Sequence, residues 1–378
     1  MLPEALPSGL LLREMVRSSP SWSICVDLPF LRFRSPLKKA ATERHSICQL
    51  NLRCLHPALR PKSRGASPTR LLEPPPMRLL VTGGCGFVGS NFIRYVLQHY
   101  GPERVTNVDA LIGSSNPANL DGVSQEYGDR YELIQGDVRD PQSVDAVFAK
   151  HHYYAVVNFA TDPSGVAHPE TPGPLMEVAR KHGVRRFVQV SSTDVYDALP
   201  GSAFFEKARA DELALAWGRQ HGQDVVVTRS APNYGPYQAP QNWLPNCIIN
   251  VLKGRPLMDE NARLSSRNWV HVEDHCAAVF AAMLDGKPGE IYDITSVAEM
   301  HDRDVLKEIL EYLGKPMELL PGVQSPDLPA AGTPRDSQKI RVQLRWTPLF
   351  SGAKGIHQTV EWYRKNRGWW EPLLETRA

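Results

Sequence analysis

The sequence lacks any run of about 20 consecutive apolar residues, the length that a helix needs to cross a bilayer, so no membrane partner is expected. It also lacks an excess of one charge, with a net charge of +2 over 378 residues. Because nucleic-acid binding requires concentrated positive charge, this balance gives no reason to expect a nucleic-acid partner. Hydrophobic residues make up 42% of the chain, which is enough for a large buried core.

Cysteine is scarce, and the six cysteines form neither a CxxC pair nor a zinc spacing. They are Cys25, Cys48, Cys54, Cys85, Cys247 and Cys276. Scattered thiols of this kind are typical of reduced cytosolic proteins, and we interpret them as free. The histidines are equally scattered. We therefore predict no metal site and a cytoplasmic location.

Acidic residues are few in residues 1–76, which are rich in Arg, Ser, Leu and Pro and end in three prolines. This stretch holds neither helical nor strand periodicity for long. A domain of the kind that follows normally begins just before its first strand, where Met77 stands. We expect residues 1–76 to be disordered or to come from a misassigned start. The alternative is an organellar transit peptide, since such leaders are basic, acid-poor and contain serine.

Strong patterning begins at Met77. Residues 78–82 (RLLVT) form a short apolar strand, residues 83–90 (GGCGFVGS) a glycine-rich turn, and residues 91–99 an amphipathic helix. Strand, glycine turn and helix in this order are the phosphate-binding arrangement of dinucleotide-binding folds, in which the helix N-terminus offers free N–H groups to the phosphates.

Each glycine of the turn has a physical role. Gly83 permits the tight turn, Gly86 lets the backbone approach a pyrophosphate, and Gly89 lets the helix pack close to the strand. Phe87 and Val88 lie between the last two glycines, and we expect them to contact the cofactor as well.

The second strand, residues 104–109, ends in Asp109. A carboxylate there binds the adenosine ribose hydroxyls and repels a 2′-phosphate, which favours NAD over NADP. A third strand at residues 131–135 leads to Asp137 and Val138, where we expect contacts to the adenine ring.

Alternation continues with a helix around residues 144–149 and a strand at residues 155–159. This order predicts an α/β fold, a Rossmann-type doubly wound parallel sheet with a smaller mixed α/β substrate-binding lobe. We assign the NAD-binding domain to residues 77–228 and mainly the substrate lobe to residues 229–378.

Five further strings resemble one family. They are FVQVS at residues 187–191, NYGPYQ at 233–238, RNWVHVEDH at 267–275, GKPGEIY at 286–292, and EWY with WWEPL at 361–373. Together with the glycine turn they resemble the dTDP-glucose 4,6-dehydratases of the extended short-chain dehydrogenase/reductase superfamily. The resemblance covers residues 77–373.

The resemblance implies a reaction on a nucleoside-diphosphate hexose such as dTDP-glucose, giving the 4-keto-6-deoxy sugar. NAD takes hydride from C4 and returns it to C6, a Tyr with a Lys accepts the hydroxyl proton, a Glu removes the C5 proton, and an Asp protonates the leaving hydroxyl. These groups must be held within a few ångströms of one another. The resemblance also implies a homodimer.

The family's Thr-Asp-Glu triplet precedes a Val-Tyr pair, which Val195 and Tyr196 match. Ser192 then falls on the Thr position, Thr193 on the general acid and Asp194 on the base. A shift by one residue restores the first two members of the triplet but loses the Glu. In either register the acid/base pair is incomplete.

Lys207 matches the family lysine that contacts the nicotinamide ribose, and residues 207–215 are expected to be helical. Four residues earlier, where the Tyr-x-x-x-Lys pattern requires tyrosine, stands Ala203. Phe204 and Phe205 carry no hydroxyl, and we expect Tyr196 to belong to the preceding strand end rather than to replace the missing tyrosine.

Other departures concern the cofactor cover and the substrate lobe. Residues 162–174 pass through a proline-rich stretch into a short helix, where the family has a longer one. Asn233 and Arg267 match positions expected to contact the substrate, Arg267 through a phosphate. Residues 324–333 lack the arginines expected near the phosphates.

Three functions and one reading without function follow. The first is an NAD-dependent nucleotide-sugar dehydratase impaired by Ala203. The second is an inactive NAD- and nucleotide-sugar-binding protein. A nucleotide-sugar 4-epimerase is a further alternative, because residues 191–193 resemble the Ser-rich loop of epimerases, although epimerases need the same tyrosine. A defective product that does not fold stably is the last reading.

Overall fold

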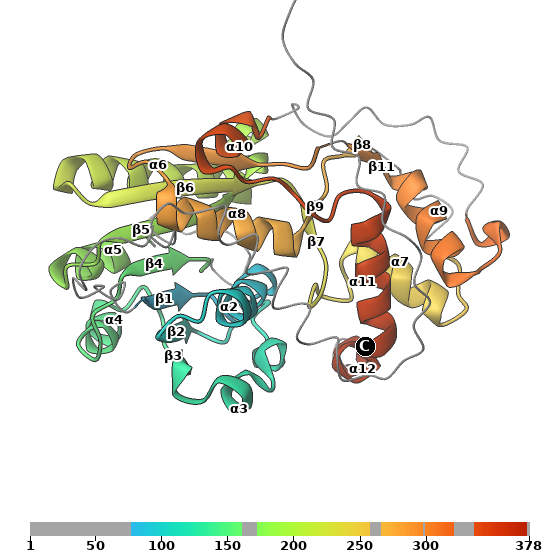
Figure 1. Cartoon of the computed structure of the whole chain (residues 1–378), viewed down its shortest axis with the longest axis horizontal. Coiled ribbons are helices and arrows are strands. Elements are labelled where there is room, and N and C mark those ends of the chain that lie inside the picture. The colour runs from blue at the N-terminus through green and yellow to red at the C-terminus, as the bar shows by residue number, and fades with distance from the viewer. Residues whose placement is uncertain (1–76, 161–171, 258–265, 298, 321–335, 376–378) are drawn as a thin grey trace, which may run out of the picture. The chain divides into compact units, whose positions relative to one another are not determined.

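A parallel sheet of seven strands organises the described part of the chain, in the order β10-β6-β5-β4-β1-β2-β3. The computed structural model describes residues 77–160, 172–257, 266–297, 299–320 and 336–375. The sheet strands are β1 (Arg78–Thr82), β2 (Arg104–Asp109), β3 (Tyr131–Gln135), β4 (Ala155–Asn158), β5 (Arg186–Ser192), β6 (Asp224–Ser230) and β10 (Ile291–Ile294). Figure 1 shows the sheet with helices on both of its faces. The predicted doubly wound α/β fold is confirmed.

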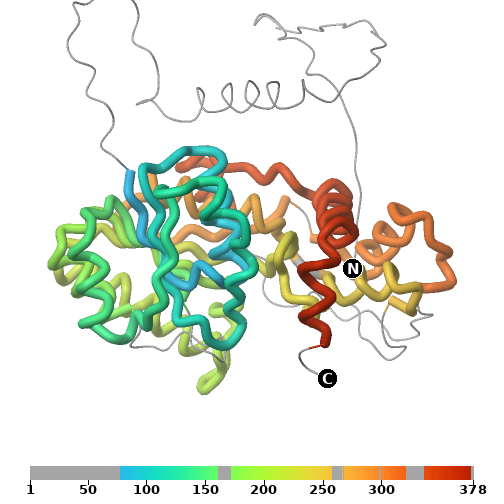
Figure 2. The backbone as a smooth tube through the Cα atoms, turned by 90° about the horizontal axis from the view of Figure 1, so that it is seen from below, coloured from blue at the N-terminus to red at the C-terminus, as the bar shows by residue number. Residues whose placement is uncertain are grey.

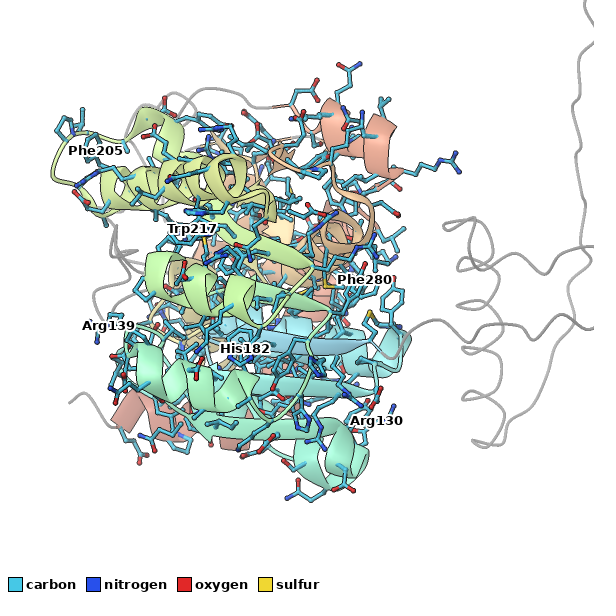
Figure 3. The ribbon with its side chains drawn as sticks, turned by 90° about the vertical axis from the view of Figure 1, so that its left-hand side faces the viewer. Arg130, Arg139, His182, Phe205, Trp217 and Phe280 are labelled. Carbon is cyan, nitrogen blue, oxygen red and sulfur yellow. The ribbon has the colours of Figure 1, made fainter. Side chains whose placement is uncertain are left out.

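Alternate residues of each strand face opposite layers. Leu79 and Val81 pack with one layer, which contains α2 (Phe87–His99) and α8 (Val272–Asp285). Leu80 faces the other layer, formed by α4 (Pro141–Phe148), α5 (Pro172–Lys181) and α6 (Ala203–His221). Figure 3 looks onto this second layer, with Phe205 and Trp217 of α6 and His182 after α5 marked. Both faces of the sheet are thus covered, as parallel sheets require.

A second core lies outside the sheet. It joins Tyr234 and Trp269 to apolar faces of four helices, which are α7 (Trp243–Leu252), α9 (Asp302–Leu313), α11 (Ala353–Lys365) and α12 (Arg367–Glu375). Figures 1 and 2 show these helices grouped beside the sheet. Two short ladders accompany them, β7 (Asn233–Tyr234) with β9 (Val270–His271) and β8 (Ser266–Arg267) with β11 (Met300–His301).

The short elements connect these layers. They are α3 (Val123–Tyr127), α10 (Gln338–Leu344) and the 3₁₀ segments η2 (Pro117–Leu120), η3 (Gly128–Arg130), η4 (Thr193–Asp197) and η5 (Met317–Leu319). α8 and β10 come from beyond residue 228 and yet belong to the sheet half. The sheet half therefore contains chain segments from both sides of the predicted boundary. The division at residues 228 and 229 stays a prediction.

Some helices extend further than the sequence predicted. The helix after the glycine turn begins at Phe87 rather than at residue 91, and α6 spans Ala203–His221 rather than residues 207–215. The predictions for residues 1–76, for residues 162–171 and for residues 324–333 lie outside the described residues. Within the described residues, no helix is long and apolar enough to cross a membrane.

Candidate functional site

The glycine turn joins the end of β1 to α2. Gly83 adopts a left-handed φ of 67°, and its N–H donates to the carbonyl of Val108 at 2.9 Å. A Cβ on Gly83 would lie 2.8 Å from the backbone of Ala160, and one on Gly89 would lie 2.5 Å from the Gly83 oxygen. Neither backbone can yield cheaply, so both positions require glycine. Gly86 caps α2 in an extended conformation, and Phe87, Val88 and Gly89 form the helix's first turn.

An open cleft lies beside this turn, at the carboxyl ends of β1, β2, β3 and β4. It brings together five of the predicted cofactor residues, which are Gly83, Gly86, Asp109, Asp137 and Val138. The carboxyl end of a parallel sheet, next to a helix N-terminus, is where dinucleotides bind in folds of this type. The glycines that a Cβ would fill and the acid at the end of β2 therefore fit a dinucleotide.

Asp109 is 5% exposed and lines the cleft. Its Oδ2 accepts from the Cys85 N–H at 2.8 Å, which ties the carboxylate to the glycine turn. Its Oδ1 accepts from the Leu111 N–H at 2.9 Å and from the Ser115 hydroxyl at 2.6 Å. The sequence did not indicate any role for Ser115.

Asp137, which follows β3, also lines the cleft. Arg139 binds its carboxylate with both Nε and Nη2, the latter at 2.6 Å from Oδ2. These bonds from Arg139 hold the pKa of Asp137 below its usual range. Val138, beside it, is 7% exposed and offers an apolar surface suited to a flat ring.

The predicted catalytic loop begins where β5 ends. Ser192 caps η4, accepting from the Asp194 N–H at 3.2 Å, and its own hydroxyl donates to Asp194 Oδ2 at 2.8 Å. Thr193 is the first residue of η4. The structure thus brings Ser192 and Asp194 into direct contact and leaves Thr193, an uncharged hydroxyl, at the position predicted for the general acid.

Lys207 lies in the first half of α6 and is half-buried. Burial lowers the pKa of its ammonium group, while the charges of Asp211 and Asp194 act in the opposite direction. Asp194 and Lys207, predicted from separate strings, therefore belong to one electrostatic cluster. The residues that line the cleft beside the glycine turn do not include this cluster, within the described chain.

Ala203 is the first residue of α6, and Ser202 caps the helix by accepting from the Phe205 N–H at 3.2 Å. Residues four apart lie on the same helix face, so Ala203 and Lys207 point to the same side. The methyl group of Ala203 brings no hydroxyl to that side. The aromatic ring of Phe204 is 43% exposed.

Tyr196 is engaged elsewhere. Its hydroxyl donates to Asp293 Oδ1 at 2.9 Å, and the Arg229 guanidinium lies 4.6 Å from its ring centroid. Burial raises the pKa of Tyr196; Arg229 lowers it and Asp293 raises it further. A tyrosine that accepts a substrate proton near neutral pH needs a lowered pKa instead. This arrangement supports the prediction that Tyr196 does not replace the missing tyrosine.

A buried ion pair lies next to the cluster of Asp194 and Lys207. Asp211 is fully buried in α6, and Arg229 of β6 donates from Nε to its Oδ2 at 2.9 Å. Burial raises the pKa of Asp211, against the effects of Arg229, Ser191 and Lys207. Because Asp211 lies one turn after Lys207, the pair fixes the helix segment that carries the lysine.

The comparisons with known proteins extend these observations. A family model described as "NAD dependent epimerase/dehydratase family" matches residues 79–295, more than half of the chain. This protein belongs to that family. The family predicted from the sequence is thereby confirmed.

Members with known activity or structure are similar over most of the described chain. The curated dTDP-glucose 4,6-dehydratase of Streptomyces niveus is 37% identical over 327 residues, covering 79% of this chain and 96% of the relative. The Bacillus anthracis dTDP-glucose 4,6-dehydratase, solved in complex with NAD, aligns with a TM-score of 0.70 at 32% identity over 79% of this chain and 99% of that one. DesIV of Streptomyces venezuelae, a dTDP-glucose 4,6-dehydratase solved with NAD and TYD bound, gives a TM-score of 0.67 at 33% identity, over 79% and 100%.

Asn233, one of the two predicted substrate residues, is not among the described residues that line the cofactor cleft. Asn233 is half-buried in β7, where its Oδ1 accepts from the Ser230 hydroxyl at 3.3 Å. Arg267 lies in β8, and its side chain is outside the described part of the structure. Contact of either residue with a substrate stays a prediction.

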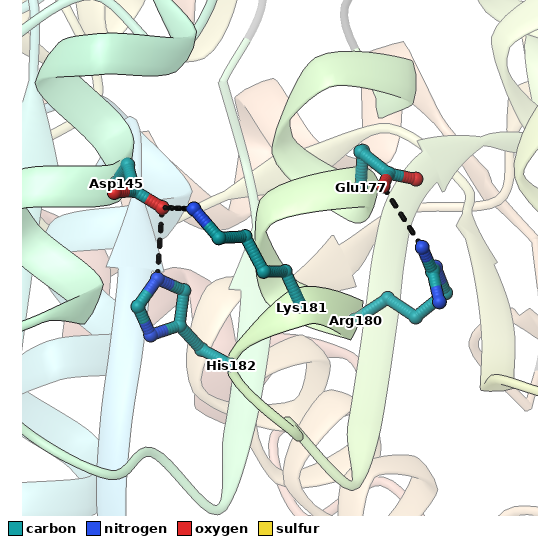
Figure 4. Close-up of polar contacts among 5 residues, drawn as sticks. All are labelled: Asp145, Glu177, Arg180, Lys181 and His182. Atoms are coloured by element: carbon teal, nitrogen blue, oxygen red, sulfur yellow. Dashed lines mark hydrogen bonds and ion pairs between the residues drawn. The ribbon is translucent and has the colours of Figure 1, made fainter.

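Ion pairs on the surface join the end of the short helix α5 to α4. Figure 4 shows Asp145 of α4 between Lys181 and His182 at the end of α5, with both nitrogens 2.9 Å from Asp145 Oδ1. Both contacts lower the pKa of Asp145. Glu177 and Arg180 form a separate pair along α5 at 2.9 Å. The buried apolar residues of α5 hold this ten-residue helix in the core, and the exposed pairs add little.

Three residues of the site were not found from the sequence. Ser115 lies in an irregular loop with no periodic pattern, Asp293 is 97 residues from its partner Tyr196, and Asp211 is 18 residues from Arg229. Nothing local distinguishes Ser115 or Asp211.

Proposed function

We propose that this protein is a nucleotide-sugar dehydratase of the dTDP-glucose 4,6-dehydratase type, which binds NAD and converts its substrate to the 4-keto-6-deoxy sugar slowly. The described cofactor residues fit a dinucleotide, whereas the catalytic residues lack two proton-transfer groups, because Ala203 and Thr193 stand where a tyrosine and an acid are expected. Support comes from the similarity to the Streptomyces niveus enzyme over nearly its whole length.

The cleft beside the glycine turn is the observation that carries the proposal. Its two space-limited glycines, Gly83 and Gly89, and the buried carboxylate of Asp109 meet the steric and polar requirements of a dinucleotide. The relatives solved with NAD have the same fold at 32% and 33% identity. Bound NAD would supply a hydride acceptor and return the hydride later in the cycle.

The protein's own groups divide the remaining work. Lys207, whose lowered pKa the charges of Asp211 and Asp194 oppose, would hold the nicotinamide ribose. Asp194 would remove the C5 proton, and the Ser192 hydroxyl, now bonded to Asp194, would bind a sugar hydroxyl. Thr193 has no acidic proton near neutral pH, so departure of the C6 hydroxyl would lack its general acid.

Turnover is expected to be low because no hydroxyl stands at Ala203. A positioned general base accelerates proton transfer by roughly 10²–10⁴-fold, and Tyr196 is bound to Asp293 with a raised pKa. The expected rate is lower than that of a complete dehydratase by at least about this factor, because Thr193 also lacks an acidic proton.

The test is to titrate the full chain with NAD by calorimetry and to measure conversion of dTDP-glucose to the 4-keto-6-deoxy product. We expect NAD to bind, and slow turnover that falls further in Lys207→Met and Asp194→Asn. The control Lys365→Met alters a 67%-exposed lysine paired with Glu361 and should leave both unchanged. Turnover that neither site variant reduces, or no NAD binding, would refute the proposal.

A binding protein without turnover is the second candidate, favoured by the same Ala203 and by the engaged hydroxyl of Tyr196. It predicts NAD affinity equal to that of the first candidate and no product, even after prolonged incubation with stoichiometric protein. The two candidates therefore separate on product formation alone. Substrate contacts by Asn233 and Arg267, a homodimer and a cytoplasmic location remain proposals beside both.

A further inference from the structure

The carboxylate of Asp109 is nearly saturated by groups of the protein itself. Oδ2 accepts from the Cys85 N–H at 2.8 Å, and Oδ1 accepts from the Leu111 N–H at 2.9 Å and the Ser115 hydroxyl at 2.6 Å. A carboxylate offers about four acceptor positions, so about one remains. The adenosine ribose of a dinucleotide presents two neighbouring hydroxyls to this acid.

The three donors differ in how easily they can leave. The N–H groups of Cys85 and Leu111 belong to the backbone of two turns and are fixed. The Ser115 hydroxyl is free to turn about one side-chain bond, while its backbone is held by its N–H bond to the Ile112 carbonyl at 3.2 Å. Next to it, the Asn116 N–H donates to the Cys85 carbonyl at 3.0 Å, which ties this loop to the glycine turn.

We propose that Ser115 is an affinity-determining residue of the cofactor site: its hydroxyl occupies on Asp109 the position of one adenosine ribose hydroxyl and must rotate away when NAD binds. This inference rests on the proposed NAD binding. Ser115 and Asp109 both line the cleft, so the hydroxyl and the ribose compete in the same space. The bond to be broken is short and its acceptor charged, which makes the competition strong.

The matched control is Ser114. It precedes Ser115 and lines the same cleft, but it is exposed and does not bond to Asp109. Ser115→Ala removes the competing hydroxyl, and Ser115→Gly removes the whole side chain. Ser114→Ala removes a neighbouring hydroxyl that does not compete. Asp109→Asn tests the acid itself. Thermal melting shows which variants are folded.

The first experiment measures NAD affinity of the full chain by calorimetry. We expect Ser115→Ala and Ser115→Gly to bind NAD about three- to tenfold more tightly than the unmodified chain, Ser114→Ala to be unchanged, and Asp109→Asn to bind more weakly. Affinity that is unchanged or reduced in both Ser115 variants overturns the inference while leaving NAD binding intact.

The second experiment assigns the competition to the ribose. ADP is compared with its 2′-deoxy and 3′-deoxy analogues on the unmodified chain and on Ser115→Ala. Loss of the hydroxyl that competes should weaken binding about three- to tenfold more in Ser115→Ala than in the unmodified chain, where Ser115 returns to Asp109. Equal losses overturn the inference. Failure of every variant to bind NAD and ADP would instead overturn the proposed function, and this inference with it.

Discussion

Ala203 stands one helical turn before Lys207, on the same face of α6, at the first position of the helix. A side chain there is only partly enclosed, and Ser202 caps the helix independently through the Phe205 N–H. A larger residue at position 203 therefore need not disturb the helix, and its cost in helix propensity is below about 1 kcal/mol.

Ala203→Tyr is expected to raise turnover of dTDP-glucose by about 10²–10⁴-fold, because it returns a phenol beside Lys207. Ala203→Phe is the matched control, identical except for the hydroxyl, and should leave turnover unchanged. The measurement is the rate of 4-keto-6-deoxy sugar formation at saturating NAD. Equal rates in the two variants would show that the missing hydroxyl does not limit this protein.

At the scale of the element, α6 is held by one buried and one exposed ion pair. Asp211 is fully buried against Arg229 of β6, whereas Glu206 pairs with Arg209 on the outer surface at 3.1 Å. Removing one partner of a buried pair leaves an uncompensated charge in the interior, while an exposed pair contributes little because water and salt screen it.

Asp211→Asn is accordingly expected to lower the free energy of unfolding by about 3–5 kcal/mol, and Glu206→Gln by no more than about 1 kcal/mol. Urea denaturation of both variants at neutral pH measures the difference. Because Asp211 also acts on Lys207, residual NAD binding by the folded fraction of Asp211→Asn should weaken too. Similar losses in the two variants would mean that Arg229 finds another partner.

The elements of the sheet half could be predicted from the sequence because their signals are local. The short apolar run before the glycine turn placed β1, and the acid at the end of the next apolar run placed the end of β2. The start of α2 was predicted four residues late, since Gly86 begins the helix without a side-chain cap. The helix α6 was predicted too short because its polar residues obscure a clear apolar stripe.

Most contacts of the candidate site join residues far apart in the sequence, so local patterns could not predict them. Tyr196 follows β5 and Asp293 lies in β10. They meet because β6 lies between these two strands in the sheet and pairs with both. Trp369 donates to Asn119 Oδ1 at 3.1 Å across 250 residues. Trp370 is fully buried and donates to the Tyr363 carbonyl at 2.7 Å.

For the whole molecule, we expect the free energy of unfolding to fall with pH already at pH values well above the pKa of ordinary carboxyl groups. Burial lowers the pKa of His271 and His275 from 6.5 to about 3; in His275 the charge of Lys207 adds to the effect. The unfolded chain takes up these protons near pH 6.5 and the folded protein does not, so stability is lost as pH falls from 6.5 toward 3. Each unit of pKa difference corresponds to about 1.4 kcal/mol.

The melting temperature should therefore fall between pH 7 and pH 5. Burial raises the pKa of Glu273 and Asp274, so the folded protein takes up these protons at a higher pH than the unfolded chain, which offsets part of the loss. His275→Phe and His271→Tyr should each flatten the profile, whereas His152→Gln, in an exposed loop, should not. A profile that neither buried-histidine variant changes would assign the acid sensitivity to other groups.

The position of β10 at one edge of the sheet has a consequence for synthesis on the ribosome. β6 ends at Ser230 and β10 begins at Ile291. About 60 residues must therefore be translated after β6 before β10, its second partner in the sheet, begins to form. At roughly 5–20 residues per second this takes about 3–12 s. During that time the valine-rich β6 is an unpaired edge without α8 to cover it, and such edges attract other strands. The nascent chain is most exposed to aggregation in this interval, when chaperone binding would matter most.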